Sequence, residues 1–159
     1  MRDIKYIVIH CTAGNQSQSI DSIKAYWKSK GWKSVGYHKI IESNGKVTEL
    51  AEPDSVTNGV RGHNFQAYHI CWVGGLTGDN RTLEQKVSLA KEIKEAQEQF
   101  PDAEVVGHRD LSPDLDGDGV IEPHEWVKLC PQFDVKDFLK QIEKLDDYID
   151  LMLDKMALR

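Results

Sequence analysis

Short apolar runs alternate along the chain with longer amphipathic stretches. The runs "IKYIVIH" (4–10), "AYHICWVGG" (67–75) and "AEVVGH" (103–108) are rich in β-branched and aromatic residues, a composition that favours buried strands. Between the first two runs, residues 35–50 contain two strand-like segments on either side of Ser43-Asn44-Gly45. A turn of this kind between two such segments predicts a β-hairpin.

Two stretches have the spacing of amphipathic helices. The first begins after Ser19, a residue that caps helix N-termini well, and ends before Gly31. In the second, Thr82 and Gln85 have the spacing of a capping box, which predicts a helix to about residue 100. The apolar stripe expected for this second helix consists of Leu83, Val87, Leu89, Ala90 and Ile93.

A further amphipathic stretch predicts a long C-terminal helix over about 134–156. Strands that alternate with helices of these lengths indicate the α/β class, with a central sheet flanked by helices. The hairpin makes that sheet mixed rather than purely parallel. At 159 residues, the chain is expected to form a single domain, 1–159, which is large enough to bury its own core.

The net charge of −6 is concentrated in the second part of the chain. Residues 101–159 carry 7 basic and 15 acidic side chains, whereas residues 1–100 carry 13 basic and 11 acidic ones. An acidic balance of this kind argues against nucleic acid as the main partner.

Cysteine usage and hydropathy bear on where the protein is made. The three cysteines, Cys11, Cys71 and Cys130, are odd in number and widely spaced, so they form no disulfide framework and suit a reducing compartment. The N-terminal apolar run is too short for a signal peptide, and no segment approaches the length of a transmembrane helix. We therefore expect synthesis in the cytoplasm without a signal peptide, and no membrane insertion.

Residues 114–125, "DLDGDGVIEPHE", have the spacing of an EF-hand calcium loop, with Gly119 at the sharp turn. Five carboxylates this close would repel one another strongly without a cation. The expected calcium ligands are carboxylates of Asp114, Asp116 and Asp118, the Val120 carbonyl, Glu122 through water, and bidentate Glu125. A calcium sensor is not expected, because Pro113 stands where a helix would enter and the sequence has no second loop.

Two histidines and one cysteine form a candidate zinc set. His10 and His108 each end an apolar strand-like run, where a side chain is held rigidly yet reaches an open edge. In "KLCP", Pro131 favours extended backbone at Cys130, so Lys128 and Cys130 share a face and the ammonium favours the thiolate. Two imidazoles and one thiolate leave a fourth tetrahedral position open, as in catalytic zinc sites. Taken singly, each histidine could be a polar residue at a strand end, and Cys130 a buried apolar residue.

These pieces together resemble the zinc-dependent N-acetylmuramoyl-L-alanine amidases of the phage-lysozyme and peptidoglycan-recognition-protein type. The resemblance covers roughly residues 4–140. It rests on five motifs in order: "IVIHCTA", "SVGYHKII" before an "NG" hairpin, "GHN" before "ICWVGG", "VVGHRDLSP" and "KLCPQFDV". It implies that His10, His108 and Cys130 bind zinc, with Tyr37 and Lys128 as catalytic partners. Members that lack the cysteine tend to bind peptidoglycan without cleaving it, so the presence of Cys130 indicates an enzyme.

The resemblance implies hydrolysis of the amide bond between N-acetylmuramic acid and L-alanine in bacterial peptidoglycan. One departure concerns Gly59, which stands where some members carry a histidine. Either His63 or Arg61 takes over whatever that histidine does for substrate binding, or no residue does. The expected substrate contacts are Arg61, His63 and Asn64. The remaining histidines, His38, His69 and His124, are expected to be structural or surface residues.

The acidic loop lies between the second and third expected zinc ligands, which compact phage members join by a much shorter segment. It is therefore interpreted as an insertion whose calcium would hold Lys128 and Cys130 in register with His108. The expected role is that of a phage or prophage endolysin, or of a bacterial wall-remodelling enzyme. An endolysin would reach the wall after release through a holin-type pore.

Two other functions remain open from the sequence. One is a peptidoglycan-recognition module that binds without hydrolysis. The other is a calcium-dependent interaction protein that docks through its long C-terminal helix, whose last residues could also form a homodimer.

Overall fold

The computed structural model describes residues 2–157, with side chains of the last helix described up to residue 147. Its sheet has five strands in the order β3-β2-β4-β1-β5. Neighbouring strands are parallel except for the β2–β3 hairpin. The mixed α/β sheet expected from the sequence is thus confirmed, and its strands are β1 Tyr6–Cys11, β2 Lys39–Ile41, β3 Val47–Glu49, β4 Ala67–Trp72 and β5 Glu104–Gly107.

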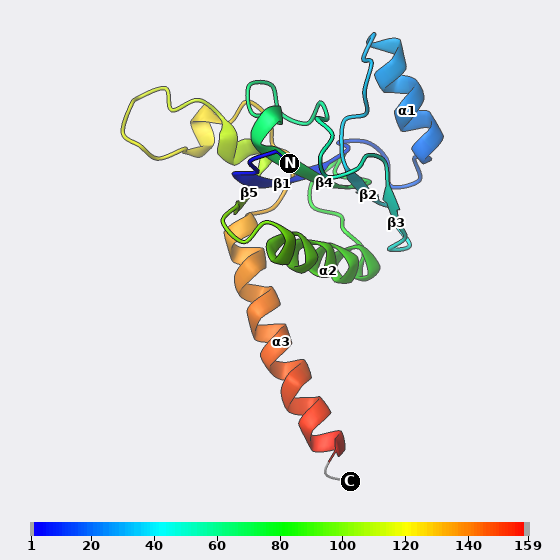
Figure 1. Cartoon of the computed structure of the whole chain (residues 1–159), viewed down its shortest axis with the longest axis vertical. Helices are drawn as coiled ribbons and strands as arrows, with labels where there is room; N and C mark the ends of the chain where they lie inside the picture. The colour runs from blue at the N-terminus through cyan, green and yellow to red at the C-terminus, as the bar shows by residue number, and fades with distance from the viewer. Residues whose placement is uncertain (1, 158–159) are drawn as a thin grey trace.

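Helices cover both faces of the sheet (Figure 1). Helix α1, Ile20–Ser29, is capped by Ser19 as expected and packs Ile23 and Trp27 against one face. Helix α2, Leu83–Gln99, and the start of α3, Val135–Ala157, enclose the larger core on the opposite face. Because strand side chains alternate, β1 directs Ile7, Ile9 and Cys11 into the larger core and His10 to the α1 side.

The predicted capping box of α2 is confirmed, but the predicted stripe is partly wrong. Leu89 and Ile93 are fully buried, whereas Leu83 and Val87 are exposed. The inward face instead includes two polar side chains, Gln85 and Glu92. Both have partners on the sheet, which is why polar residues occupy inward positions that a pattern of apolar residues does not identify.

Helix α3 matches the predicted C-terminal helix closely. Asp134 caps its N-terminus by accepting a hydrogen bond from Asp137 N at 3.0 Å. Phe138 and Ile142 are buried against the body of the protein, whereas Leu145 is 47% exposed. Figure 1 shows the rest of the helix extending past α2 and away from the sheet. The expected dimer contact lies on side chains outside the described residues and stays a prediction.

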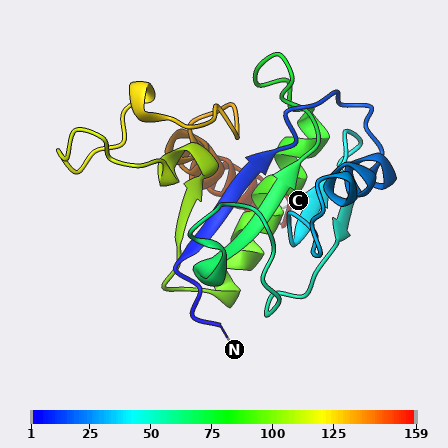
Figure 2. The ribbon, with the colours of Figure 1, turned by 90° about the horizontal axis from the view of Figure 1, so that it is seen from above.

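The acidic loop projects from the side of β5, opposite to α1 (Figure 2). A short 3-10 turn, His108–Leu111, precedes it, and a second one, Pro123–Glu125, forms its last residues, where a helix pair would have α-helices. This agrees with the expectation that the loop is not part of a sensor-type helix pair. Within residues 2–157, none of the helices combines the length and apolar character needed to cross a membrane.

Candidate active site

The sheet topology brings His10 and His108 together. His10 lies near the carboxyl end of β1, and His108 follows directly after β5, the parallel neighbour of β1. Cys130 comes from the segment that returns after the acidic loop, and its carbonyl accepts a hydrogen bond from Arg109 N at 3.0 Å. Gly107 permits this approach, because a Cβ there would lie 2.7 Å from Pro131 Cδ. The three expected zinc ligands therefore converge from three separate segments.

The three ligand atoms fit one tetrahedral zinc ion. His10 Nδ1 lies 3.2 Å from His108 Nδ1 and 3.8 Å from Cys130 Sγ, and all three atoms are within 4.8 Å of one another. Bond lengths of about 2.0–2.1 Å to nitrogen and about 2.3 Å to sulfur put tetrahedral ligands about 3.3 Å (N to N) and about 3.6 Å (N to S) apart. The donor set and its spacing therefore suit zinc with a fourth position left open.

Burial dominates the electrostatics of the three ligands. Desolvation, the other histidines and Lys128 lower the pKa of His10 well below its ordinary value, and desolvation, Lys128 and His63 lower the pKa of His108 to about 4. Both imidazoles are thus neutral and able to bind a metal near pH 7. Burial and the neighbouring Cys11 thiol raise the pKa of Cys130. Lys128 is not among the causes that shift the pKa of Cys130, so the thiolate expected from its ammonium stays a prediction, and a bound cation would favour that thiolate.

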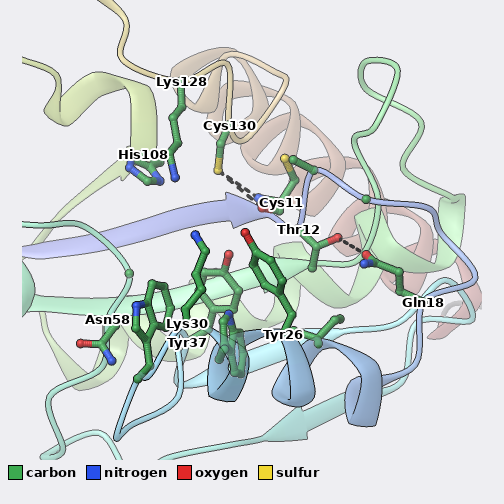
Figure 3. Close-up of a pocket in the computed structure, with 16 residues that line it drawn as sticks. Cys11, Thr12, Gln18, Tyr26, Lys30, Tyr37, Asn58, His108, Lys128 and Cys130 are labelled. Carbon is green, nitrogen blue, oxygen red and sulfur yellow. Dashed lines mark hydrogen bonds between the residues drawn. The ribbon is translucent and has the colours of Figure 1, made fainter.

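A cavity of about 410 Å³ opens directly onto the ligand set. Its lining includes His108 and Cys130 together with Tyr37 and Lys128, the two expected catalytic partners. Figure 3 shows Lys128 reaching into the cavity between His108 and Cys130, and Tyr37 rising from the opposite wall. A cation and a hydroxyl group therefore face the open side of the site.

Tyr37 is held by rings on two sides. Its ring centroid lies 4.9 Å from that of His10 and 5.5 Å from that of Trp27. Burial is the largest cause that raises the pKa of Tyr37 well above its ordinary value. The phenol therefore stays protonated and can donate a hydrogen bond across the whole neutral pH range.

A second depression of about 720 Å³ continues the cavity past His108 and Lys128 toward the acidic loop. Arg61 and His63 line it, as expected for substrate contacts. Asn64 is absent from its lining, and the Asn64 side-chain oxygen instead accepts a hydrogen bond from Val60 N at 2.8 Å. The two depressions together form a groove along one side of the zinc ligands, with aromatic residues of the α1 region at one end.

The sequence reasoning missed the role of His69. This residue of β4 is fully buried, and its Nδ1 lies 2.8 Å from His10 Nε2. The only signal in the sequence is a histidine within the otherwise apolar strand "AYHICW". Of the other two histidines expected to be structural or on the surface, His38 is buried beside β4 and His124 is exposed on the acidic loop.

The acidic loop brings four of its carboxylates close together. Oxygen atoms of Asp114, Asp116, Asp118 and Glu125 lie within 4.8 Å of one another, and Gly119 has φ +83°. Glu125 is buried, and within the described residues neither of its carboxylate oxygens has a hydrogen-bond partner. Val120 is exposed, and Glu122 lies beside His124 at 3.4 Å.

Comparison with known proteins agrees with this fold. A sequence profile described as N-acetylmuramoyl-L-alanine amidase matches residues 1–125. The endolysin of Enterobacteria phage K11 is 30% identical over 139 residues, which cover 83% of each chain. An uncharacterized protein of Haemophilus influenzae is 48% identical over 94 residues, 55% of this chain and 81% of that protein.

Among solved structures, the N-acetylmuramoyl-L-alanine amidase LysC from Clostridium intestinale URNW has the same fold. Its TM-score is 0.72 at 20% identity, over 89% of this chain and 87% of that chain. The profile match ends before Lys128 and Cys130, so the geometry is what adds these two residues to the site. By sequence match and fold, the chain belongs to the N-acetylmuramoyl-L-alanine amidase family.

Proposed function

We propose that the chain hydrolyses the amide bond between N-acetylmuramic acid and L-alanine in bacterial peptidoglycan, using a zinc ion held by His10, His108 and Cys130. The convergence of these three ligand atoms beside an open cavity carries the proposal. A zinc ion in this site would supply Lewis acidity, which activates water and polarises a carbonyl group near neutral pH.

The residues around the ligands supply the remaining groups for amide hydrolysis. Attack on the scissile carbonyl carbon places negative charge on its oxygen, and the ammonium of Lys128 stabilises that charge at the cavity wall. The hydroxyl of Tyr37 donates a hydrogen bond that orients the carbonyl or the attacking water. A thiolate ligand would reduce the net charge of the zinc site and so weaken its stabilisation of the oxyanion. The positive charge of Lys128 is therefore needed to stabilise that oxygen.

The groove suits an amphipathic polymer such as a glycan with its peptide stem. Tyr26, at the α1 end, is 57% exposed, and Trp32, which lines both depressions, is 37% exposed, so these two aromatic side chains can pack against sugar rings. At the other end, Arg61 and His63 offer donors to the stem. We therefore assign the glycan to the α1 end and propose the bacterial cell wall as the place of action. The route to the wall, with or without a holin-type pore, stays a prediction.

Product analysis tests the activity. Zinc-loaded protein is incubated with purified peptidoglycan, and the released fragments are identified by mass spectrometry and by labelling of free amino groups. We expect peptides with a free L-alanine N-terminus, and glycan strands whose muramic acid carboxyl groups have been freed from the amide bond. Removal of zinc by a chelator should abolish release, and added zinc should restore it. A protein that binds the wall and releases nothing would instead be a recognition module, and the proposal would fail.

We also propose that Asp114, Asp116, Asp118 and Glu125 hold a calcium ion, with the Val120 carbonyl and Glu122 completing the EF-hand order. The buried carboxylate of Glu125 supports this, because a buried charge is costly unless a cation compensates it. Within the described residues its oxygens have no hydrogen-bond partner, and the one basic nitrogen close to them is His124 Nε2, 3.6 Å from Oε1. Burial and Asp116 raise the pKa of Glu125. The loop is closed at its base by a hydrogen bond from Val127 N to Ser112 Oγ at 3.1 Å, so calcium would stiffen the segment that carries Lys128.

Calcium titration tests this second site. The protein is freed of metals, reloaded with one equivalent of zinc, and titrated with calcium chloride in a calorimeter and in thermal melts. We expect one calcium per chain and a higher Tm. Glu125→Gln should weaken calcium binding at least about tenfold, since it removes a ligand charge, whereas Asp102→Asn, an exposed acid outside the loop, should not. Absence of binding at millimolar calcium would refute the calcium site and leave the zinc proposal untouched.

A further inference from the structure

A buried chain of hydrogen bonds leads away from His10 on the side opposite to the cavity. His10 Nε2 lies 2.8 Å from His69 Nδ1, and His69 Nε2 lies 3.0 Å from Asn64 Oδ1. The same Asn64 oxygen accepts a hydrogen bond from Val60 N at 2.8 Å. His10 and His69 are both buried, with 1% and 0% of their surface exposed. The hydrogen bonds therefore run through the two buried imidazoles of His10 and His69 to the half-buried Asn64 and a backbone amide.

The backbone amide at the end of the chain fixes the direction of every bond in it. A backbone N–H can only donate, so the Asn64 atom beside Val60 N is the amide oxygen, an acceptor. His69 must then donate to it from Nε2. A neutral imidazole has one donor and one acceptor nitrogen, so His69 Nδ1 accepts from His10 Nε2–H. His10 Nδ1 is consequently left without a proton, and this is the atom that faces His108 and Cys130.

The fold makes room for His69 in a specific way. In the parallel pairing of β1 with β4, His69 is opposite Val8, two residues before His10 on the same face of the sheet. The His69 ring occupies the space above Gly59, where an added Cβ would lie 2.3 Å from His69 Nδ1. Gly59 is therefore matched to His69, and a larger residue at position 59 would displace the imidazole.

We propose that His69 and Asn64 are positioning residues that hold His10 in the Nε2–H tautomer, with its Nδ1 lone pair aimed at the zinc position. The inference rests on the proposed zinc site and adds residues outside the ligand set. Partners behind a metal-bound histidine orient the ring and fix its tautomer, and their loss typically weakens metal binding about 10- to 100-fold.

Zinc affinity of matched variants tests the proposal. His69→Leu removes the acceptor but keeps an apolar side chain in the core, whereas His69→Asn keeps an oxygen near the position of Nδ1. His38→Asn is the control: His38 is equally buried, its Nδ1 accepts a hydrogen bond from His69 N at 2.9 Å, which an Asn oxygen can keep, and its side chain takes no part in the bonds from His10 to Asn64. Affinity is measured by competition with a chromophoric chelator, without substrate, and folding is checked by thermal melts.

We expect zinc binding about 10- to 100-fold weaker in His69→Leu, close to wild type in His69→Asn, and unchanged in His38→Asn even if its Tm falls. Gly59→Ala should resemble His69→Leu, because it displaces the same ring. In the metal-free wild type, long-range ¹H–¹⁵N spectra should show protons on Nε2 of both His10 and His69.

A proton on His69 Nδ1, or wild-type zinc affinity in His69→Leu, would overturn the inference. If the wild type hydrolyses peptidoglycan with zinc while His69→Leu binds zinc equally well, only the positioning role fails. If the wild type binds no zinc, the proposed function fails as well.

Discussion

Lys128 shows how a single charge is expected to act in this site. Its ammonium enters the cavity between His108 and Cys130, two of the proposed zinc ligands (Figure 3), but it is not part of the proposed ligand set. Lys128→Met should lower kcat about 100- to 1,000-fold, because removal of one donor to a developing oxyanion costs about that much. Zinc content should stay at the wild-type level. The measurement is steady-state hydrolysis of soluble wall fragments together with metal analysis.

Lys128→Arg is the matched variant, since it keeps the positive charge, and it should retain much more activity than Lys128→Met. An unchanged kcat in Lys128→Met would contradict the assigned role. Loss of zinc from Lys128→Met would show a structural role instead.

At the same scale, the residues differ in how far the sequence reveals them. His10, His108, Cys130, Tyr37 and Lys128 belong to motifs, so they could be named before the structure was known. His69 could not, because its contact with His10 depends on the register of β1 with β4 and on the space above Gly59. Neither the register nor that space is encoded by local spacing along the chain.

At the scale of elements, Gln85 is one of two polar side chains that join α2 to the sheet. Gln85 Nε2 donates to the carbonyls of Val73 at 2.8 Å and Ile41 at 3.3 Å, while its oxygen accepts from Thr82 N. Gln85→Ala should lower the free energy of unfolding by about 2–3 kcal/mol, because buried groups lose their partners and the capping box is lost. Urea unfolding measures this change.

Gln97 provides the matched control on the same helix, because its side chain is exposed. Gln97→Ala should change the free energy of unfolding by less than about 0.5 kcal/mol. Equal effects of the two substitutions would contradict the anchoring role of Gln85.

The bounds of the helices were predictable from caps and periodicity, as α1, α2 and α3 show. The inward face of α2 was not, because Gln85 and Glu92 point inward while Leu83 and Val87 are exposed. Glu92 forms an ion pair with Lys39 of β2 at 2.8 Å. A count of apolar residues cannot anticipate an inward carboxylate whose partner lies on a distant strand.

At the scale of the whole molecule, buried neutral histidines make stability depend on pH. Burial and Arg2 lower the pKa of His38 to about 4, against the partial compensation of its hydrogen bond to the Ser55 carbonyl. Between about pH 6.5 and pH 4 the unfolded chain then binds more protons than the folded one, so stability falls as pH falls. The contribution of His38 is fully present above pH 6.5 and amounts to at most about 3 kcal/mol.

His38→Asn isolates this contribution, since it keeps an acceptor for His69 N but does not titrate. In urea unfolding of the metal-free protein, the wild type should lose more stability between pH 6.5 and pH 4 than the variant does. Identical pH dependence in the two proteins would contradict the neutral, buried state of His38.

Also at this scale, the class of the fold was predictable but the order of its strands was not. Alternating runs and one hairpin indicated a mixed sheet. The order β3-β2-β4-β1-β5 depends on which apolar faces pack together, and this order is what places the ends of β1 and β5 side by side. The resemblance of the motifs, rather than their spacing, is what linked the three zinc ligands before the structure did.

The most direct test of the zinc centre is the metal content of Cys130→Ala beside that of the wild type and Cys71→Ala. Cys71 is equally buried and lies next to His10 in the sheet, but it is not part of the ligand set. We predict one zinc per chain in the wild type and in Cys71→Ala, and none in Cys130→Ala, which should also fail to hydrolyse peptidoglycan. Retention of zinc and activity by Cys130→Ala would contradict the proposed centre.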